Sequence, residues 1–289
     1  MAGHAKPHND GATSQLRRIE GRHNPLLKSL RKAFAHGEAN KDGVCAIEGW
    51  HIVDEAIRSG LKFQAVFFSA SAEARAERLL PQLGGHVEKL LLPDNLFAGA
   101  VPSDTPQGIA ALVRCREFRL EDALARSADG PVLVIAGVQD PGNLGTIVRS
   151  AEAFEAAGLL LGEGTVSPLN WKAVRASAGS VFRLPVARVQ LPEALDQLRE
   201  RGLRLVATSS HKGTPLSEAT LSGSIAIFIG SEGTGLPRDL IKQMDEIVAI
   251  PHSPRVESLN AGVAASIVLY EVARQRAQST TEAPSHGEI

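Results

Sequence analysis

The sequence predicts an α/β protein of two domains, and three observations predict this fold class. Short aliphatic runs alternate with amphipathic helical segments along most of the chain. The runs of the second half are almost continuously apolar, which is typical of parallel strands covered by helices on both faces. The length of 289 residues is long for one domain and natural for two. We therefore expect a small α/β sandwich followed by a larger, mostly parallel α/β domain.

The first domain is expected over residues 16–116. Asn24 is placed to cap a helix that begins at Pro25 and is closed by Gly37. Further helices are expected at 50–60, 72–83 and 93–101, and strands at 44–49, 63–69, 86–92 and 108–114. The stretch 117–130 is expected to be a linker that contains one helix.

The second domain is expected over residues 131–276, with disordered tails at 1–15 and 277–289. Its strands are expected at 132–138, 158–164, 184–189, 204–210, 225–231 and 246–251. A long helix over 259–276 should close the domain.

Composition limits the class of protein more than its activity. The net charge is −1, so the chain as a whole gives no sign of binding a polyanion. Basic side chains outnumber acidic ones near the N-terminus, at Arg17, Arg18, Arg22, Lys28, Arg31, Lys32 and Lys41. They form either a phosphate-binding surface or a solvated helix face. The two cysteines, the lack of an 18-residue apolar run and the polar N-terminus predict a cytoplasmic protein.

Three unusual loops follow expected strands, at 139–149, 230–237 and 250–260. Ligands of parallel α/β sheets bind beyond the carboxyl ends of the strands, where loops lead into helices. In the first loop, "QDPGNLGTIVR", we expect Asn143 to cap the helix and Gly145 to allow close backbone approach. Arg149 lies six residues further on, and either forms an ion pair with Glu152 or Asp140 or serves a ligand.

The second loop, "GSEGTG", is too rich in glycine for an ordinary turn. Gly230, Gly233 and Gly235 provide positive φ angles or clearance for a ligand. The loop lacks the Gly-Lys-Ser/Thr of a P-loop, and it comes too late in the chain for a dinucleotide fingerprint. Glu232 would repel a bare phosphate, and it better suits a cation, a hydroxyl group or the Arg149 guanidinium.

The third loop ends in Glu257-Ser258-Leu259-Asn260 before an alanine-rich helix. Ser258 or Asn260 is the candidate helix cap. Leu259 between them is expected to form a wall for a flat apolar ligand. Small residues at the start of the helix, Ala261, Gly262, Ala264 and Ala265, allow another helix to pack closely.

The order "NLGTIVR", "GSEGTGL" and "IP…ESLN…A…YE" closely resembles the three motifs of the SpoU (TrmH-like) RNA 2′-O-ribose methyltransferases of the SPOUT superfamily. This resemblance covers residues 131–276. The stretches "RHNPLLKSLR", "EGWHIVDEA" and "TPQGIAAL" resemble landmarks of the RNA substrate-binding domain that precedes the catalytic domain in two-domain members. The third loop departs from the usual pattern, since His252 replaces a methionine and Pro254 a glycine, which should stiffen it.

The resemblance implies a trefoil-knotted catalytic domain that binds S-adenosylmethionine and forms a homodimer through its last helix, with an active site completed across the interface. The cofactor-binding residues that it implies are Gly230, Ser231, Glu232, Gly233, Ile250, Pro251, Ser258, Leu259 and Asn260. The chain shows no cluster of metal-ligating residues and the implied reaction needs no metal, and the lack of an 18-residue apolar run predicts no membrane span.

The resemblance also assigns catalysis to Asn143, Arg149, Glu232, Ser258 and Asn260. Arg149 activates the ribose hydroxyl in one of two ways, because a guanidinium normally stays protonated. Either burial holds it neutral and it acts as a base, or it stays charged, grips a phosphate and lowers the pKa of the hydroxyl. Asn143 and Asn260 would orient the hydroxyl and the cofactor, Glu232 would position Arg149, and Ser258 would line the pocket.

The substrate implied by the two-domain organisation is ribosomal RNA, with transfer RNA as the alternative. The residues expected to bind it are Arg22, Asn24, Lys28, Arg31 and Lys32. His23, Trp50 and His51 are candidates for stacking on bases. A protein that keeps the fold but only binds RNA or assists ribosome assembly is a further alternative, which the complete set of catalytic residues disfavours.

Overall fold

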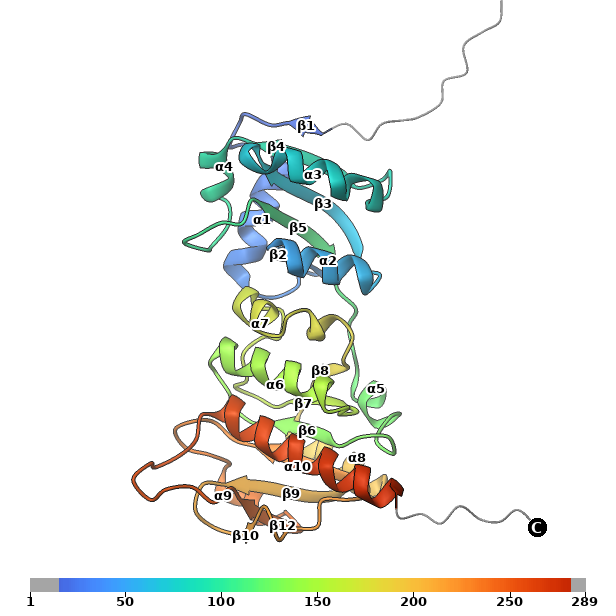
Figure 1. Cartoon of the computed structure of the whole chain (residues 1–289), viewed down its shortest axis with the longest axis vertical. Helices are drawn as coiled ribbons and strands as arrows, with labels where there is room; N and C mark the ends of the chain where they lie inside the picture. Colours follow the sequence, from blue (N-terminus) through green and yellow to red (C-terminus); the bar gives the residue numbers. More distant parts are fainter. Residues whose placement is uncertain (1–15, 282–289) are drawn as a thin grey trace, which may run out of the picture.

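The computed structural model describes residues 16–281, and these form two sheets stacked along the long axis of the molecule (Figure 1). The expected tail at 1–15 lies outside the described residues, as do residues 282–289. No helix of the described chain is both long and apolar enough to cross a membrane.

The first sheet has the strand order β1-β4-β3-β5-β2. Its strands are β1 (Arg17–Arg18), β2 (Val44–Glu48), β3 (Lys62–Ser69), β4 (Glu88–Leu92) and β5 (Ile109–Arg114). Strand β5 runs antiparallel to β2 and β3, whereas β4 is parallel to β3. Its helices are α1 (Pro25–His36), α2 (Trp50–Arg58), α3 (Glu73–Leu79) and α4 (Asp94–Ala98). The four longer strands and the four helices confirm the sequence prediction, whereas the two-residue β1 was not foreseen.

Helix α1 shows why these boundaries were readable. The Asn24 side chain accepts hydrogen bonds from the backbone N–H groups of Leu26 (2.9 Å) and Leu27 (3.3 Å), as expected for a cap before a proline. Gly37 ends the helix in the left-handed region at φ 63°. The buried face presents Leu27 and Leu30 to the sheet.

The second sheet is parallel throughout, with the order β10-β12-β9-β11-β6-β7-β8. Its strands are β6 (Val132–Ile135), β7 (Gly158–Leu161), β8 (Val186–Arg188), β9 (Arg204–Ser209), β10 (Thr214–Pro215), β11 (Ile225–Ile229) and β12 (Glu246–Ala249). All six expected strands are present, so the parallel α/β prediction is confirmed. The predicted knot stays a prediction.

Helices cover both faces of this sheet, as the continuous apolar strands required. They are α5 (Leu120–Leu124), α6 (Pro141–Ala153), α7 (Trp171–Ala176), α8 (Leu191–Glu200), α9 (Arg238–Ile241) and α10 (Ala261–Thr281). Helix α10 runs beyond Arg276, so the first residues of the expected C-terminal tail are helical. In Figure 1 helices α6 and α10 lie side by side over one face of the sheet, and α7 lies between them and the first sheet.

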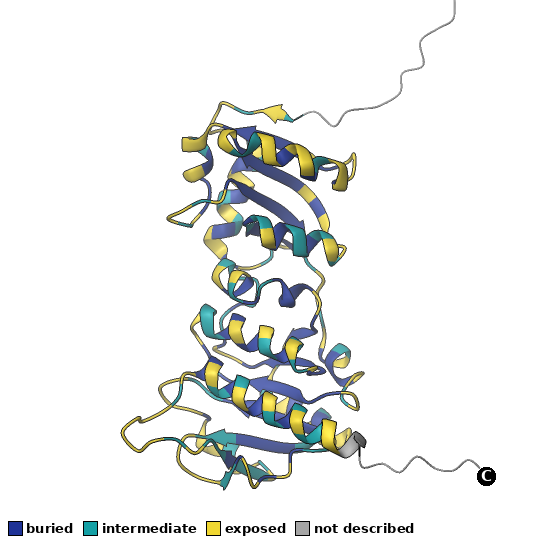
Figure 2. Cartoon of the chain, in the orientation of Figure 1, coloured by how far each residue is buried: buried dark blue, intermediate teal, exposed yellow. Residues whose placement is uncertain are grey.

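One apolar cluster is continuous through both domains. It includes buried side chains from β2, α2, α7, α6, β6 and α10, namely Ile47, Ile52, Val174, Ile147, Leu133 and Val268. Figure 2 shows the same continuity as a buried zone that runs through the centre of the molecule. The Arg183 guanidinium adds a polar link, since it bonds Glu55 of the first domain (2.6 Å) and Glu152 of the second (2.7 Å). The two domains are therefore packed against each other as well as joined by a linker.

Helix α6 holds its place because Gly145 lets α7 approach closely. A Cβ atom at this position would lie 2.5 Å from both the Ala173 carbonyl oxygen and the Ala176 Cβ, and 2.9 Å from the Ser177 nitrogen. Two of these three atoms belong to the backbone, so they cannot move away cheaply.

We therefore expect Gly145→Ala to destabilise the protein by about 1–3 kcal/mol, seen as a lower midpoint of thermal unfolding. In a solvent-exposed helix with no neighbour in contact, a Gly→Ala change would stabilise the protein by about 0.5–1 kcal/mol. The sign of the change in the free energy of unfolding therefore distinguishes steric crowding from helix propensity. Gly85→Ala is the matched control, because nothing lies within 4 Å of its Cβ position. An unchanged or raised midpoint for Gly145→Ala would show that α7 does not constrain α6.

Candidate active site

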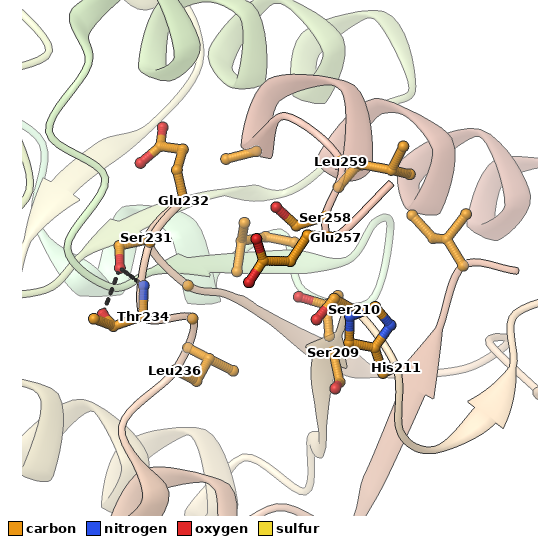
Figure 3. Close-up of a pocket in the computed structure, with 18 of the residues that line it drawn as sticks. Ser209, Ser210, His211, Ser231, Glu232, Thr234, Leu236, Glu257, Ser258 and Leu259 are labelled. Atoms are coloured by element: carbon orange, nitrogen blue, oxygen red, sulfur yellow. Dashed lines mark hydrogen bonds between the residues drawn. The ribbon is translucent and has the colours of Figure 1, made fainter. Parts of the chain in front are cut away.

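Three loops at the carboxyl ends of β9, β11 and β12 enclose one cavity of about 410 Å³ (Figure 3). Most of the expected cofactor-binding residues line it: Gly230, Ser231, Glu232, Gly233, Ile250, Ser258 and Leu259. Pro251 and Asn260 are not among the lining residues. In Figure 3 the side chains of Glu257 and Ser258 lie across the cavity from Ser231 and Thr234. The second and third motifs, far apart in the sequence, are thus brought to one cavity, as the strand-end argument predicted, whereas no residue of the first motif, 139–149, lines it.

The glycine-rich loop after β11 is closed by its own hydrogen bonds. The Gly235 N–H donates to the Ser231 carbonyl (3.0 Å), and the Ser231 and Thr234 hydroxyls lie 2.9 Å apart. Gly235 has a φ of 66°, and a Cβ at Gly230 would lie 2.2 Å from the Gly235 carbonyl carbon. Both positions therefore need glycine. Gly233 has neither constraint within the chain, so any need for glycine there would come from a ligand.

Asn143 joins the three motifs, but it does not cap the helix as we expected. The cap of α6 is Asp140, whose side chain accepts the Asn143 backbone N–H at 2.8 Å. Pro141 takes the first helical position, which places Asp140 one residue before it at the cap. The Asn143 amide is thereby free: its Nδ2 donates to Glu232 Oε1 (2.5 Å) and its Oδ1 accepts from Asn260 Nδ2 (2.8 Å).

The third loop reaches this chain of hydrogen bonds through its last residue. Asn260 Oδ1 accepts the Val263 backbone N–H at 3.2 Å, so Asn260, and not Ser258, caps α10. Its Nδ2 is the group that binds Asn143. The position of α10 is in this way coupled to the position of α6, and both are coupled to the glycine-rich loop. We call the series Asn260–Asn143–Glu232 the amide bridge.

Arg149 is exposed on α6 and stands apart from the amide bridge. Six residues beyond Asn143 correspond to about 9 Å along the helix axis. The expected contact with Glu232 is absent, since that carboxylate binds Asn143. The two alternative ion pairs are also absent from the described residues, because Asp140 caps the helix and Glu152 binds Arg183 at 2.7 Å. Arg149 is therefore available to a ligand or to another chain.

The ion pair between Glu152 and Arg183 lowers the pKa of Glu152. Burial pulls the pKa of Glu152 upward, but hydrogen bonds from Arg183 and Ser180 outweigh it, so the pKa lies below its ordinary value. Arg183 therefore keeps Glu152 ionised and engaged on the side of α6 that faces the first domain.

A further wall of the cavity was not predicted. The loop after β9 contributes Thr208, Ser209, Ser210 and His211. Its signal was present, since a polar stretch follows an aliphatic strand at the same sheet edge. The unusual His252 packs against it, with its ring centroid 5.7 Å from that of His211 and its Nδ1 2.7 Å from the Ile250 carbonyl oxygen. His252 therefore braces the third loop against the β9 loop.

Comparison with known proteins decides the family. Residues 130–270 match the SpoU rRNA Methylase family, and residues 24–111 match the MRM3-like substrate binding domain. The 23S rRNA (guanosine(2553)-2′-O)-methyltransferase of Bacillus subtilis is 34% identical over 257 residues, which cover 89% of this chain and 99% of that protein. The chain belongs to the SpoU rRNA methylase family.

Solved structures agree with this assignment. The S-adenosylmethionine-bound rRNA methyltransferase from Sinorhizobium meliloti superposes with a TM-score of 0.78 at 28% identity, over 90% of this chain and 98% of that one. The cofactor complex of the SpoU methyltransferase AviRb from Streptomyces viridochromogenes gives 0.77 at 25% identity, over 87% and 98%. The predicted family, α/β fold, methyltransferase activity and methyl donor are confirmed.

Within the MRM3-like domain, the expected RNA-binding residues divide into two groups. Asn24 caps α1, and Arg31 donates to the carbonyl oxygens of Gly99 (3.2 Å) and Arg22 (3.3 Å), so these side chains hold local structure. The side chains of the other three are exposed: Arg22, Lys28 and Lys32. Of the stacking candidates, Trp50 is half-buried, and the Arg75 guanidinium lies 4.2 Å from its ring centroid. Of the five expected RNA-binding residues, Arg22, Lys28 and Lys32 thus stay candidates for contact with RNA.

Proposed function

We propose that this SpoU-family protein transfers a methyl group from S-adenosylmethionine to a ribose 2′-hydroxyl of ribosomal RNA, as a homodimer in the cytoplasm. The observation that carries the proposal is the cavity lined by the second and third motif loops, whose Glu232 is tied to the first motif through the amide bridge. The substrate follows the Bacillus subtilis relative, whose name specifies 23S rRNA and which this chain matches over almost its full length. Transfer RNA remains the alternative substrate.

The cavity suits the cofactor in size and in charge. Its volume of about 410 Å³ is in the range of small-molecule sites. Aliphatic side chains, among them Leu236 and Leu259, offer an apolar surface for the adenine ring. The lining includes the carboxylates Glu232 and Glu257 but no lysine or arginine, which favours a positively charged sulfonium ligand. The bound cofactor would supply an activated methyl group at its sulfur.

The protein's own residues would then position and activate the ribose hydroxyl. Asn143 and Asn260 would orient it, since their amides are hydrogen-bonded to each other and, through Asn143, to Glu232 of the cavity lining. Arg149 is exposed, so the single chain does not provide the burial that a neutral guanidinium requires. This supports the second of the two roles. A charged Arg149 would grip a backbone phosphate and lower the pKa of the neighbouring 2′-hydroxyl.

The homodimer would form through α10. We expected the small-residue face of α10 to form the dimer, but Gly262 and Ala265 are buried within the chain, and Gly262 packs on Thr146 of α6. The opposite face instead presents an exposed apolar stripe of Val263, Ile267 and Tyr270, which are 48%, 37% and 57% exposed. Figure 2 shows exposed positions repeating along this helix. An apolar stripe of this kind marks an interaction surface.

The geometry of α6 and α10 brings this stripe close to Arg149. The two helices run in register, since Ser150 bonds Ser266 (2.7 Å) and Phe154 packs edge-on against Tyr270 (5.9 Å between ring centroids). Arg149 precedes Ser150 on the exposed side of α6. A partner seated on the α10 stripe would therefore lie beside Arg149, which could reach the partner's cavity. This supports an active site shared between two chains.

The test of the function is methyl transfer from labelled S-adenosylmethionine to total RNA of cells that lack the protein, followed by mapping of the alkali-resistant linkage. We expect the wild type to modify one ribosomal RNA nucleotide, and Arg149→Ala to lose at least about 100-fold in rate because the hydroxyl is no longer activated. Cofactor binding, measured by calorimetry, should be unchanged.

Arg201→Ala, at the exposed end of α8, is the charge-matched control and should retain the rate. A full rate for Arg149→Ala would refute its catalytic role. Cofactor binding without transfer to any RNA would favour the non-catalytic alternative, and label in transfer RNA would favour the other substrate.

The dimer is tested by Ile267→Glu, which places a charge in the apolar stripe. We expect the wild type to sediment as a dimer and Ile267→Glu as a monomer that lacks methyl transfer, because burying an unpaired carboxylate is costly. Ala74→Glu on the exposed face of α3 is the control and should stay dimeric and active. A monomeric wild type, or an active monomeric Ile267→Glu, would contradict the shared active site.

A further inference from the structure

A second cavity, of about 160 Å³, lies between the two domains. The first domain contributes the end of β2, the start of α2 and the loop that leads into β5, through Glu48, His51 and Gln107. The second domain contributes helix α7, through Trp171 and Arg175. Figure 1 shows α7 facing the first sheet at this junction. The catalytic residues described above take no part in this cavity.

The cavity is held open by fixed contacts around it. Gly49 has a φ of 101°, and a Cβ there would lie 3.0 Å from the Gln107 side-chain oxygen. That oxygen accepts the Trp50 backbone N–H (3.3 Å), and the Gln107 carbonyl accepts the Trp50 indole N–H (2.7 Å). The domains are clamped nearby, through Arg183 and Glu55. The site is therefore preformed rather than a gap between loosely joined parts.

Its polar groups call for a ligand with N–H donors. The Glu48 carboxylate is half-buried and accepts a hydrogen bond from the Ser103 hydroxyl (2.6 Å) and another from the Gln107 backbone. Burial raises the pKa of Glu48, and the Ser103 hydrogen bond, the Gln107 backbone and the charge of Arg175 offset only part of that rise. Within residues 16–281 neither Glu48 nor Arg175 forms an ion pair. Arg175 acts on Glu48 only at a distance, so this half-buried carboxylate gains from a ligand that donates to it directly.

We propose that this cavity binds a guanine base of the RNA substrate, an inference that rests on the proposed function. Guanine is the base whose Watson–Crick edge presents two adjacent N–H donors, which match the two oxygens of Glu48. The Trp171 ring provides a stacking surface, and the exposed Arg175 guanidinium provides a partner for the attached phosphate. Unpaired RNA bases are read in this way, by stacking combined with hydrogen bonds to the edge.

This position would give the inter-domain junction a role in substrate choice. The first domain supplies the carboxylate and the second supplies the aromatic wall and the cation. A base held there is read by both domains at once, and α7 that carries the wall packs directly on α6 through Gly145. The RNA would thus be anchored at a fixed position relative to the helix that carries Asn143 and Arg149.

The test titrates the full protein with the 5′-monophosphates of guanosine, adenosine, cytidine and uridine, with S-adenosylhomocysteine present to fill the cofactor cavity. We expect guanosine monophosphate to bind tightest, and Glu48→Gln to weaken it roughly tenfold while the other three change by less than about twofold. Glu77→Gln, an exposed carboxylate on α3, is the matched control and should change nothing. Trp171→Ala should weaken all four nucleotides, since stacking does not depend on the base.

A second arm separates an RNA base from a free nucleotide. In the methyl-transfer assay Glu48→Gln should raise the KM for RNA severalfold at unchanged kcat. Equal affinity for all four nucleotides, no effect of Glu48→Gln, or no saturable guanosine monophosphate binding up to about 10 mM would overturn the proposal. Guanosine monophosphate binding with an unchanged KM would overturn the RNA assignment in favour of a free nucleotide. If the wild type transfers no methyl group, the proposed function fails while the nucleotide titration still decides the cavity.

Discussion

The side chain of Asn143 holds together the loops on which the rest of the site depends. Its amide donates to Glu232 on the glycine-rich loop and accepts from Asn260 at the start of α10. An asparagine suits this position because one short neutral side chain offers both a donor and an acceptor. The arrangement is possible only because Asp140 satisfies the helix terminus and leaves the Asn143 amide free. The bridge thereby fixes Glu232, which lines the cavity, relative to α6 and α10.

Helix α6 extends the same constraint through two further contacts. Through Gly145 it contacts α7, which forms the junction with the RNA-binding domain. Through Ser150 it contacts α10, which carries the exposed apolar stripe. Arg149 lies between these contacts and is left without a carboxylate partner in the described chain, because Arg183 engages Glu152. Helix α6 is thus in contact with the domain junction and with the helix that carries the proposed dimer face, and the amide bridge connects it to the proposed cofactor cavity.

Much of this was readable from the sequence, and the exceptions have physical causes. The aliphatic runs predicted the main strands, because a strand that is buried on both faces must be apolar throughout. Asn24-Pro25 predicted the start of α1, because a capping side chain directly before a proline is typical of a helix N-terminus. The choice between Asp140 and Asn143 as cap was not readable, since both side chains accept hydrogen bonds at a helix start. The contact of Glu232 with Asn143 was missed because no local spacing determines a pairing across 89 residues.

The central claim is that the amide bridge acts as a unit, and not residue by residue, in shaping the proposed cofactor cavity. The most direct test is a double-mutant cycle with Asn143→Ala and Glu232→Gln, measuring the Kd for S-adenosylmethionine by calorimetry in all four proteins. If the bridge acts as a unit, each single change weakens binding and the double variant is no weaker than the worse single, a coupling of about 1–3 kcal/mol. If the two effects instead multiply in the double variant, the residues act independently and the account is wrong.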